Sequence, residues 1–306
     1  MINIEKANTL VEALPYIKRH NGKTMVVKYG GSAMKNKGIK DSVIEDLLLM
    51  SYVGINIVLV HGGGPEITQM LEKLNIKTSF VEGLRYTDEE TMEIVQMVLA
   101  GKINKSLVAK INTFGGKAIG LCGVDNNMIK CSPYKNFKLG YVGEIEEVNS
   151  EIIEDSLKAG YISVIATIGV GENGETYNVN GDIAASEIAK KLKADKLILL
   201  TDVPGILIQA DDDNTLIPEL HEKDVEELMD NGIITGGMIP KINGCIDALN
   251  SGVNRIHILD GRIPHSIITE LFTDSGIGTL ICKENEGSDK YKGVVDRIEN
   301  LKNETH

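Results

Sequence analysis

Three consecutive glycines follow an apolar segment in the sequence I-V-L-V-H-G-G-G-P at residues 57–65. The apolar segment predicts a buried strand, and Pro65 suits the first turn of a helix, because a proline loses no hydrogen bond there. A turn without side chains lets a ligand approach the main-chain N–H groups, and the start of a helix adds partial positive charge. The segment therefore predicts an anion-binding turn.

Two lysines and one aspartate are also suited to chemistry on an anion. Lys28 precedes Gly30 and Gly31 at the end of an apolar segment, and its ammonium group could reach a phosphoryl oxygen in the turn. Taken alone, Lys28 is better explained as a surface lysine at a strand end. Lys241 follows G-G-M-I-P in the first turn of a predicted helix, where a cation is unfavourable unless an anion lies nearby. Asp182 begins another predicted helix, and capping alone would explain it.

Several other chemistries lack the residues that they need. The sequence H-G-G-G also forms the oxyanion hole of lipase-like hydrolases, but the G-x-S-x-G nucleophile motif is absent. Gly169, Gly171 and Gly174 have the spacing of a dinucleotide fingerprint, yet an extended polar segment follows them instead of a helix. No P-loop motif occurs, and His61 is expected to bond the backbone rather than act as a base. The four cysteines fit no zinc pattern, so we expect buried, reduced thiols and no metal site.

The composition excludes further classes of function. The formal net charge of −12 argues against binding to nucleic acid or to an anionic membrane surface. No apolar run approaches the roughly 20 residues that span a bilayer, and the N-terminus lacks the apolar core of a signal peptide. We therefore expect a cytoplasmic protein with no nucleic-acid or membrane partner.

Segments with the patterns of strands and helices alternate along the chain. Strands are predicted at residues 24–29, 55–60, 117–121, 161–168, 196–203, 254–259 and 278–282. Helices are predicted at residues 7–19, 40–53, 65–74, 182–192, 239–250 and 263–272, and a long helix begins with the capping-box sequence T-D-E-E at residues 87–90. This order predicts a three-layer αβα sandwich around a mainly parallel sheet, with the glycine turns at the carboxyl ends of the strands. A hairpin-like region at about residues 125–160 would form an antiparallel excursion or a lid.

The motifs occur in a characteristic order: K-Y-G-G-S, H-G-G-G-P, G-L-R-Y-T-D, Y-N-V-N-G-D, T-D-V-P-G-I and G-G-M-I-P-K. In this order they resemble the amino acid kinase family, over about residues 7–282. The segments at 83–88 and 177–182 are similar to those of members that phosphorylate N-acetylglutamate in arginine biosynthesis. The resemblance implies the amino acid kinase fold and transfer of a phosphoryl group from ATP to the side-chain carboxylate of N-acetyl-L-glutamate. The product would be N-acetylglutamyl 5-phosphate.

The resemblance also implies a role for each matching residue. Lys28 and Lys241 would approach the transferred phosphoryl group from opposite sides, with Asp182 holding both lysines in place. The residues that would contact N-acetylglutamate are Gly63, Gly64, Asn178 and Arg85, the last of them at the α-carboxylate. The residues that would lie along ATP and its Mg²⁺ are Gly30, Gly31, Asp202 and Gly205. Relatives often carry lysine at Val124 and alanine at Gly181, and neither departure is expected to alter the chemistry.

Three parts and a regulatory site follow from the same resemblance. Residues 1–20 would form an oligomerisation helix, residues 21–180 a lobe for N-acetylglutamate, and residues 181–306 a lobe for ATP. Arginine-inhibited members interlace such helices into a hexamer, a trimer of dimers, whereas packing within one chain is the simpler alternative. The residues that would bind L-arginine as a feedback inhibitor are His257, Glu270 and Gly276.

Two alternative functions fit parts of the pattern. The first is another member of the family, acting on glutamate, aspartate, carbamate or UMP. Arg85 with Asn178 favours an acylated amino acid instead. The second is a non-catalytic arginine sensor, like the kinase-like domain of N-acetylglutamate synthase. The presence of both lysines and Asp182 opposes this reading, as does the lack of room for an acetyltransferase domain.

Overall fold

The computed structural model describes residues 4–31, 37–81, 83–135, 138–209, 212–274 and 276–283. The strands are β1 Thr24–Tyr29, β2 Asn56–His61, β3 Phe80–Val81, β4 Leu84–Arg85, β5 Ala118–Cys122, β6 Ile129–Pro133, β7 Gly143–Val148, β8 Ile162–Ala166, β9 Ile168–Val170, β10 Thr176–Asn178, β11 Lys196–Thr201, β12 Glu219–His221, β13 Arg255–Asp260 and β14 Thr279–Cys282. The α-helices are α1 Ile4–Glu12, α2 Leu14–His20, α3 Lys37–Tyr52, α4 Gly64–Lys73, α5 Glu89–Gln96, α6 Asn104–Thr113, α7 Glu151–Lys158, α8 Gly181–Leu192, α9 Val225–Asp230, α10 Met238–Asn250 and α11 Ser266–Phe272.

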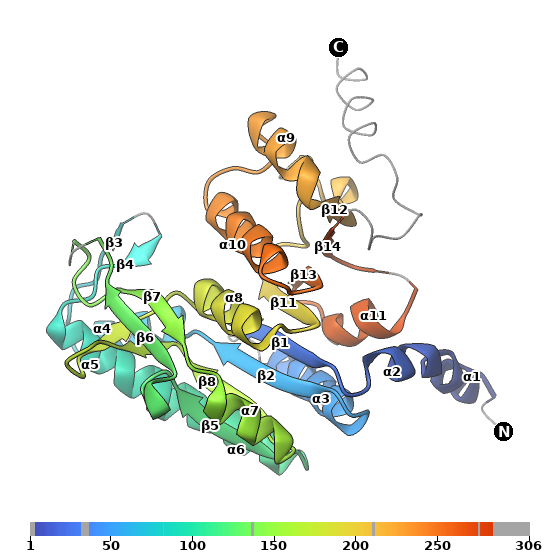
Figure 1. The fold of residues 1–306 in the computed structure, drawn as a ribbon, viewed down its shortest axis with the longest axis horizontal. Coiled ribbons are helices and arrows are strands. Elements are labelled where there is room, and N and C mark those ends of the chain that lie inside the picture. The colour runs from blue at the N-terminus through green and yellow to red at the C-terminus, as the bar shows by residue number, and fades with distance from the viewer. Residues whose placement is uncertain are drawn as a thin grey trace.

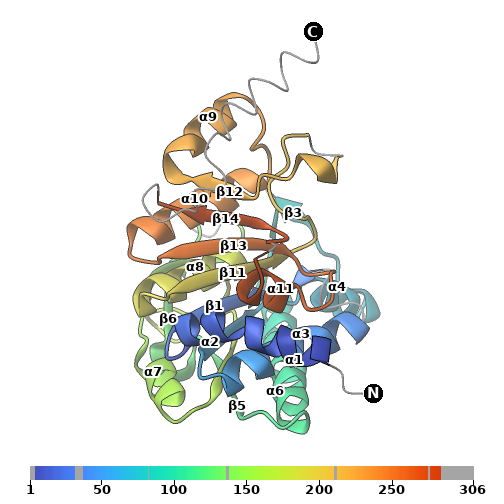
Figure 2. The ribbon, with the colours of Figure 1, turned by 90° about the vertical axis from the view of Figure 1, so that its right-hand side faces the viewer.

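Eight strands form the central sheet, in the order β12-β14-β13-β11-β1-β2-β8-β5 (Figures 1 and 2). Its neighbouring strands run parallel, apart from the antiparallel pair β13 and β14. The mainly parallel sheet predicted from the sequence is confirmed. Because β1 lies between β2 and β11, one continuous sheet crosses the predicted boundary at residue 180, and the division into lobes stays a prediction.

Helices cover both faces of this sheet. Alternate residues of β1 enter two separate cores, with Met25 and Val27 on one face and Val26 on the other. Helices α3, α6 and α11 pack on the first face, whereas α7, α8 and α10 pack on the second. A strand buried on both faces needs apolar residues throughout, which explains the continuous apolar runs in the sequence. The predicted three-layer sandwich is confirmed.

Two smaller sheets stand outside the central one. β6 and β7 form an antiparallel pair within the predicted hairpin-like region, and β9 and β10 extend it to four strands. This is the antiparallel excursion expected there, although α7 in the same region is not predicted. β3 and β4 form a second, two-stranded hairpin that the sequence patterns do not predict, because each strand has two residues.

Some predicted helix boundaries are wrong. The helix predicted at residues 7–19 is two helices that meet at Ala13, because Pro15 lacks an N–H group and interrupts the hydrogen-bond ladder. Asp88, not Thr87, caps α5 by accepting a hydrogen bond from the Thr91 N–H group at 2.9 Å. The long helix that follows contains a π-helical segment, Met97–Ile103, between α5 and α6.

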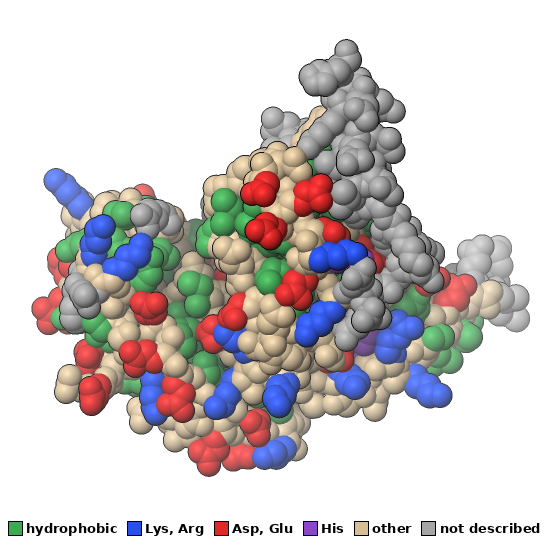
Figure 3. Space-filling view, turned by 45° about the horizontal axis from the view of Figure 1, so that its top comes forward, with side chains coloured by type: hydrophobic (Ala, Val, Ile, Leu, Met, Phe, Trp, Pro, Cys, Tyr) green, Lys and Arg blue, Asp and Glu red, His purple; other side chains and the backbone are tan. Residues whose placement is uncertain are grey.

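Two findings bear on partners. In the part of the chain that the structure describes, no helix has both the length and the apolarity to cross a membrane. Acidic and basic side chains are interspersed over the face shown in Figure 3. Residues 284–306 lie outside the described residues.

Candidate active site

Two lysines and one aspartate meet at the carboxyl edge of the central sheet. Lys28 lies near the end of β1, Asp182 in the first turn of α8, and Lys241 near the start of α10. The Lys28 Nζ atom lies 2.9 Å from Asp182 Oδ1, and the Lys241 Nζ atom lies 3.0 Å from Asp182 Oδ2. The structure therefore brings the three predicted residues together, with one carboxylate between two ammonium groups.

Asp182 is ionised in this position. Burial raises its pKa, but the ammonium groups of Lys28 and Lys241 outweigh that effect and lower the pKa to about 2. The expectation that Asp182 caps α8 is wrong, because the cap is Asn180, whose side-chain oxygen accepts hydrogen bonds from the backbone N–H groups of Asp182 and Ile183. Since Asn180 satisfies the helix end, the Asp182 carboxylate is available to the lysines.

The glycine turn connects β2 to α4 beside these cations. Gly63 is the N-cap of α4, and Gly64 is its first residue. The Gly62 N–H group donates to the Tyr29 carbonyl at 3.1 Å, which holds the turn against the end of β1. The space next to Gly62 and Gly64 is open, whereas side chains of the π-helical segment Met97–Ile103 occupy the place of a Cβ on Gly63. The turn thus presents a helix N-terminus that is open to an anion.

Gly30 and Gly31 follow β1 and leave room beside the lysine. A Cβ on Gly30 would lie 3.6 Å from Lys28 Nζ. Because glycine has no Cβ, the ammonium group can be approached from that side. Gly31 has a φ of +64°, which favours glycine, and open space lies beside it.

Arg85 is a buried cation whose hydrogen-bond partners are neutral. Its guanidinium donates to the Gly64 carbonyl at 3.1 Å, to the Thr68 hydroxyl at 2.7 Å and to the Thr78 hydroxyl, and it lies over the Phe80 ring. Arg85 is 6% exposed, and burial lowers its pKa. No carboxylate among the described residues forms an ion pair with it. A buried guanidinium without a counterion is suited to an anionic ligand.

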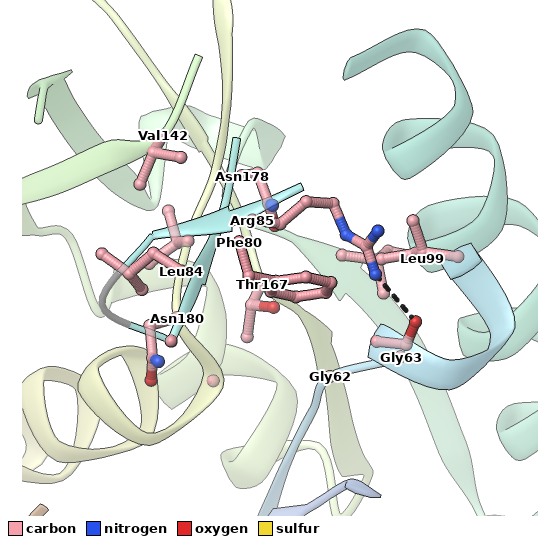
Figure 4. Close-up of a pocket in the computed structure, with 15 residues that line it drawn as sticks. Gly62, Gly63, Phe80, Leu84, Arg85, Leu99, Val142, Thr167, Asn178 and Asn180 are labelled. Carbon is pink, nitrogen blue, oxygen red and sulfur yellow. Dashed lines mark hydrogen bonds between the residues drawn. The ribbon is translucent and has the colours of Figure 1, made fainter. Parts of the chain in front are cut away.

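A cavity of about 170 Å³ separates Arg85 from the start of α8 (Figure 4). Its lining combines polar and apolar groups: Gly62, Gly63, Gly64, Arg85, Thr167, Asn178, Asn180 and Gly181 with Ile67, Phe80, Leu84, Leu99, Val142 and Val179. Asn178 Nδ2 donates to the Thr87 hydroxyl at 3.2 Å, and that hydroxyl donates to the Arg85 carbonyl at 2.9 Å. The predicted residues Arg85 and Asn178 therefore line one cavity and are connected through a buried threonine.

Among the lining residues that sequence reasoning misses, Thr167, Leu99 and Asn180 illustrate three causes. Thr167 follows β8 at the same carboxyl edge, where its position depends on the pairing of β8 with β2. Leu99 reaches the cavity from the π-helical segment, which no sequence pattern marks. Asn180 has a usable signal, because asparagine directly before a helix is a preferred N-cap.

Two residues predicted to contact ATP, Asp202 and Gly205, lie outside the lining of this cavity. Asp202 is exposed directly after β11, and Gly205 is buried. A Cβ on Gly205 would lie 2.5 Å from the Thr279 Oγ1 atom, so the glycine allows the close approach of β14. Neither residue lines the cavity, and their contact with ATP stays a prediction.

His61 bonds the backbone, as the sequence predicts. Its Nδ1 atom lies 3.0 Å from the Gly62 carbonyl, and its Nε2 atom lies 3.2 Å from Asn104 Nδ2. Burial lowers the pKa of His61 to about 4, so the ring is neutral. This pattern fits a proton on Nδ1 and assigns His61 to support of the glycine turn.

A second cluster lies on the opposite face of the sheet, between β13 and α11. His257 Nδ1 lies 2.8 Å from Glu270 Oε1, and the Ile277 N–H group donates to Glu270 Oε2 at 2.8 Å. A Cβ on Gly276 would lie 3.3 Å from Glu270 Oε2. Burial lowers the pKa of His257, whereas for Glu270 the hydrogen bond from His257 outweighs burial and lowers the pKa. The structure therefore joins His257, Glu270 and Gly276 around an ionised carboxylate.

Lys196 borders this cluster and is not predicted from the sequence. It is 3% exposed on β11 and lies in register with Arg255 of β13. Burial and the neighbouring Arg255 lower its pKa to about 8. No sequence signal marks this burial, because a lysine that opens an apolar segment such as K-L-I-L-L is ordinarily exposed.

Comparison with known proteins gives consistent matches. The profile described as "Amino acid kinase family" matches residues 23–260. The acetylglutamate kinase of Clostridioides difficile (strain 630) is 75% identical over 286 residues, which are 94% of this chain and 100% of that relative. The acetylglutamate kinase of Clostridium kluyveri is 56% identical over 278 residues, which are 90% of this chain and 98% of the relative.

Solved structures share the fold. N-acetylglutamate synthase from Neisseria gonorrhoeae, complexed with coenzyme A and N-acetyl-glutamate, superposes with a TM-score of 0.80 and 26% identity, over 98% of this chain and 70% of that chain. Carbamate kinase from Giardia lamblia superposes with a TM-score of 0.60 and 16% identity, over 86% of this chain and 99% of that chain.

Proposed function

The chain belongs to the amino acid kinase family, and on this premise we propose that it transfers the γ-phosphoryl group of ATP to the side-chain carboxylate of N-acetyl-L-glutamate. The product is N-acetylglutamyl 5-phosphate. The predicted family and type of enzyme are confirmed by relatives of 75% and 56% identity that span nearly the whole chain. The observation that carries the proposal is the Asp182 carboxylate between Lys28 and Lys241, directly after Gly181, which lines the same cavity as Arg85.

Charge neutralisation is the main task of the lysines. In the transfer, an acceptor carboxylate oxygen forms a bond to the γ-phosphorus atom while the bond to the β–γ bridging oxygen breaks and ADP leaves. Both reactants are anions, so fixed positive groups lower the barrier most when they lie where negative charge accumulates. Asp182 holds Lys28 and Lys241 at 2.9 and 3.0 Å, which keeps the two like charges together before any substrate binds.

The glycine turn and Arg85 position the acceptor. Gly63 and Gly64 offer backbone N–H groups at the start of α4, and Arg85 offers a guanidinium that lacks a carboxylate partner among the described residues. Asn178 lines the same cavity and suits the acetamido group, for which it supplies both a donor and an acceptor. ATP would approach along Gly30, Gly31 and the carboxyl end of β11, with Mg²⁺ bound chiefly through its phosphates.

Acceptor choice tests the substrate. We expect a coupled assay of ADP release to show turnover with N-acetylglutamate and far lower kcat/KM with glutamate, aspartate, carbamate or UMP. Unacetylated glutamate carries an ammonium group where the proposed substrate has a neutral amide, so equal turnover on glutamate would disprove the substrate assignment. The assay also tests the sensor alternative, since a non-catalytic sensor would release no ADP with any acceptor.

We also propose that L-arginine binds the cluster of His257, Glu270 and Gly276 as an inhibitor. Arginine carries a guanidinium, which a carboxylate can bind, and an α-carboxylate, which a cation can bind. Glu270 and the buried Lys196 supply these two charges on the same face of the sheet. The N-terminal helices reach this region, because the Tyr16 hydroxyl donates to Asp274 just after α11. Arginine binding and helix position would thus be coupled.

Oligomerisation through the N-terminal helices is part of this proposal. Three apolar residues there are more than half exposed: Leu10, Val11 and Leu14. Hydrophobic side chains are visible at the α1 end of the molecule in Figure 3. Interlacing of the N-terminal helices of different chains would bury these three side chains, in a hexamer built from three dimers.

Truncation separates the regulatory proposal from the catalytic one. Removal of residues 1–13 deletes α1 but keeps α2 and its contact with Asp274. We expect this variant to be a dimer with normal kcat and weaker inhibition by arginine. A hexamer of unchanged size would contradict the interlacing, and an arginine-insensitive wild type would contradict the regulatory site while leaving the kinase assignment intact.

We place the enzyme in the cytoplasm, where both substrates and reduced cysteines are expected.

A further inference from the structure

A histidine, a cysteine and a glutamate meet at the edge of the central sheet, on β12 and β14, and β14 lies beside the strand β13 that carries His257. Glu219 and His221 alternate on β12 and therefore point to the same face. Cys282 lies on the neighbouring strand β14, in register with His221. One potential ligand atom from each of these three side chains lies within 4.8 Å of the other two. The pairing of β12 with β14 thus brings the sulfur donor of Cys282 to nitrogen and oxygen donors that precede it by more than 60 residues.

From this assembly we propose that Glu219, His221 and Cys282 form a binding site for one Zn²⁺ ion. Zinc binds this mixture of thiolate, imidazole and carboxylate in tetrahedral geometry, and three protein ligands leave the fourth position to water. Magnesium and calcium prefer oxygen ligands and do not suit a cysteine.

Burial and an unpartnered ring nitrogen support a cation at this place. Glu219 is 1% exposed and Cys282 is 0% exposed, so both donor groups are shielded from bulk water. Arg255 lies in register with Cys282 across β13 and β14. The His221 Nδ1 atom is buried, and no described residue forms a hydrogen bond with it. His221 Nε2 lies 3.0 Å from Glu219 Oε1, which keeps the ring next to the carboxylate.

The position of the cluster separates the metal from the lysines that would act on the phosphoryl group. β12 is four strands away from β1, which corresponds to about 19 Å in a sheet with the usual strand spacing. The ion therefore takes no part in phosphoryl transfer. It would connect the three-residue edge strand β12 to β14, and with it the segment that leads into α9.

Equilibrium dialysis against Zn²⁺ with a competing chelator tests the site on the full chain. We expect one bound ion per chain in the wild type, and a loss of affinity in Cys282→Ser that exceeds the 10–100-fold typical of an outer-shell group. Cys122→Ser is the matched control, because Cys122 lies on β5 at the opposite end of the sheet and its loss should leave binding unchanged.

Cobalt substitution adds a spectroscopic readout. Co²⁺ bound by Cys282 should give a thiolate-to-metal absorption band that is present in the wild type and in Cys122→Ser but absent in Cys282→Ser. If Cys282→Ser does not fold, His221→Gln serves instead and should lose the bound ion. A wild type that binds no Zn²⁺, or a Cys282→Ser or His221→Gln variant that binds it as tightly as the wild type, would overturn the proposal. Kinase activity is not the readout, so failure of this proposal leaves the proposed reaction unaffected.

Discussion

Lys241 contacts the carboxylate of Asp182 at 3.0 Å, although the two residues lie in different helices and 59 positions apart. The other oxygen of the same carboxylate contacts Lys28 on β1. Two ammonium groups that would repel each other are therefore held at one place by a single acid. This arrangement fixes two positive charges next to Gly181, a residue that lines the cavity.

Loss of Lys241 should impair catalysis and leave the fold intact. We expect Lys241→Ala to lower kcat by about 10²–10³-fold, the usual effect of removing one group that stabilises transition-state charge. Lys190→Ala is the matched control, because Lys190 also connects α8 to α10 but pairs with Glu187 and Asp247 instead of Asp182. Steady-state kinetics and circular dichroism measure both effects, and a kcat near the wild-type value in Lys241→Ala would exclude a role in charge stabilisation.

Loss of Arg85 should affect binding of the acceptor more than that of ATP. The guanidinium is already buried and bonded to neutral groups, so a carboxylate ligand gains a full charge-assisted interaction. We expect Arg85→Gln to raise the KM for N-acetylglutamate by about 10–100-fold, with a smaller change in the KM for ATP. Arg262→Gln, which removes an exposed arginine paired with Asp260, should leave both KM values unchanged. An unaltered acceptor KM in Arg85→Gln would refute the assignment.

Two glycines of the site should respond differently to alanine. A Cβ on Gly63 would lie 2.3 Å from Ile103 Cδ1 and 2.7 Å from Leu99 Cδ2, whereas a Cβ on Gly181 would lie 3.5 Å from Lys28 Cε. We therefore expect Gly63→Ala to lower the free energy of unfolding by about 1–3 kcal/mol and to displace the turn. Gly181→Ala should keep or raise stability by up to about 1 kcal/mol, because alanine favours the start of a helix.

Urea denaturation and the KM for N-acetylglutamate measure these two variants. The substitution Ile103→Val removes the nearest methyl group, so the double variant Gly63→Ala/Ile103→Val should recover part of the lost stability. Equal free energies of unfolding and equal KM values in Gly63→Ala and Gly181→Ala would show that the π-helical segment can move away from the turn.

Local features of this fold are predictable because their causes are local. The apolar segment 24–29 coincides with β1, and the glycine run coincides with the turn between β2 and α4. Strand–helix alternation suffices to predict a mainly parallel sheet, since parallel strands need crossover helices. The break at Ala13 also had a local cause, Pro15, which the apolar pattern of the two helices masks.

Features that depend on strand order are not predictable in the same way. Lys196 is buried next to the His257–Glu270 pair because β11 lies beside β13, and no pattern within either strand encodes that neighbour. Sequence motifs for metal sites also do not detect the cluster of Glu219 and Cys282, because only the pairing of β12 with β14 brings these residues together. Family resemblance supplies the contact of Asp182 with both lysines, whereas residue type alone favours a helix cap at that position.

Acid pH should weaken the folded state through His20. This residue is 4% exposed in α2 and packs against the Phe272 ring of α11, with ring centroids 5.9 Å apart. Burial and the nearby Lys196 lower its pKa from 6.5 to about 4. Between these values the unfolded chain binds a proton that the folded chain does not. The free energy of unfolding should therefore fall by up to about 3 kcal/mol as the pH decreases from 6.5 to 4.

The variant His20→Leu isolates this contribution. His61, whose pKa is also lowered to about 4, titrates in the same range but is present in both proteins, so their difference reports His20 alone. Urea denaturation at pH 7, 6, 5 and 4 should show that the stability of His20→Leu declines less steeply than that of the wild type. Since His20 joins α2 to α11, the hydrogen-exchange protection factors in these two helices should decrease at acid pH in the wild type. Parallel stability curves for the two proteins would mean that His20 remains accessible to protons in the folded state.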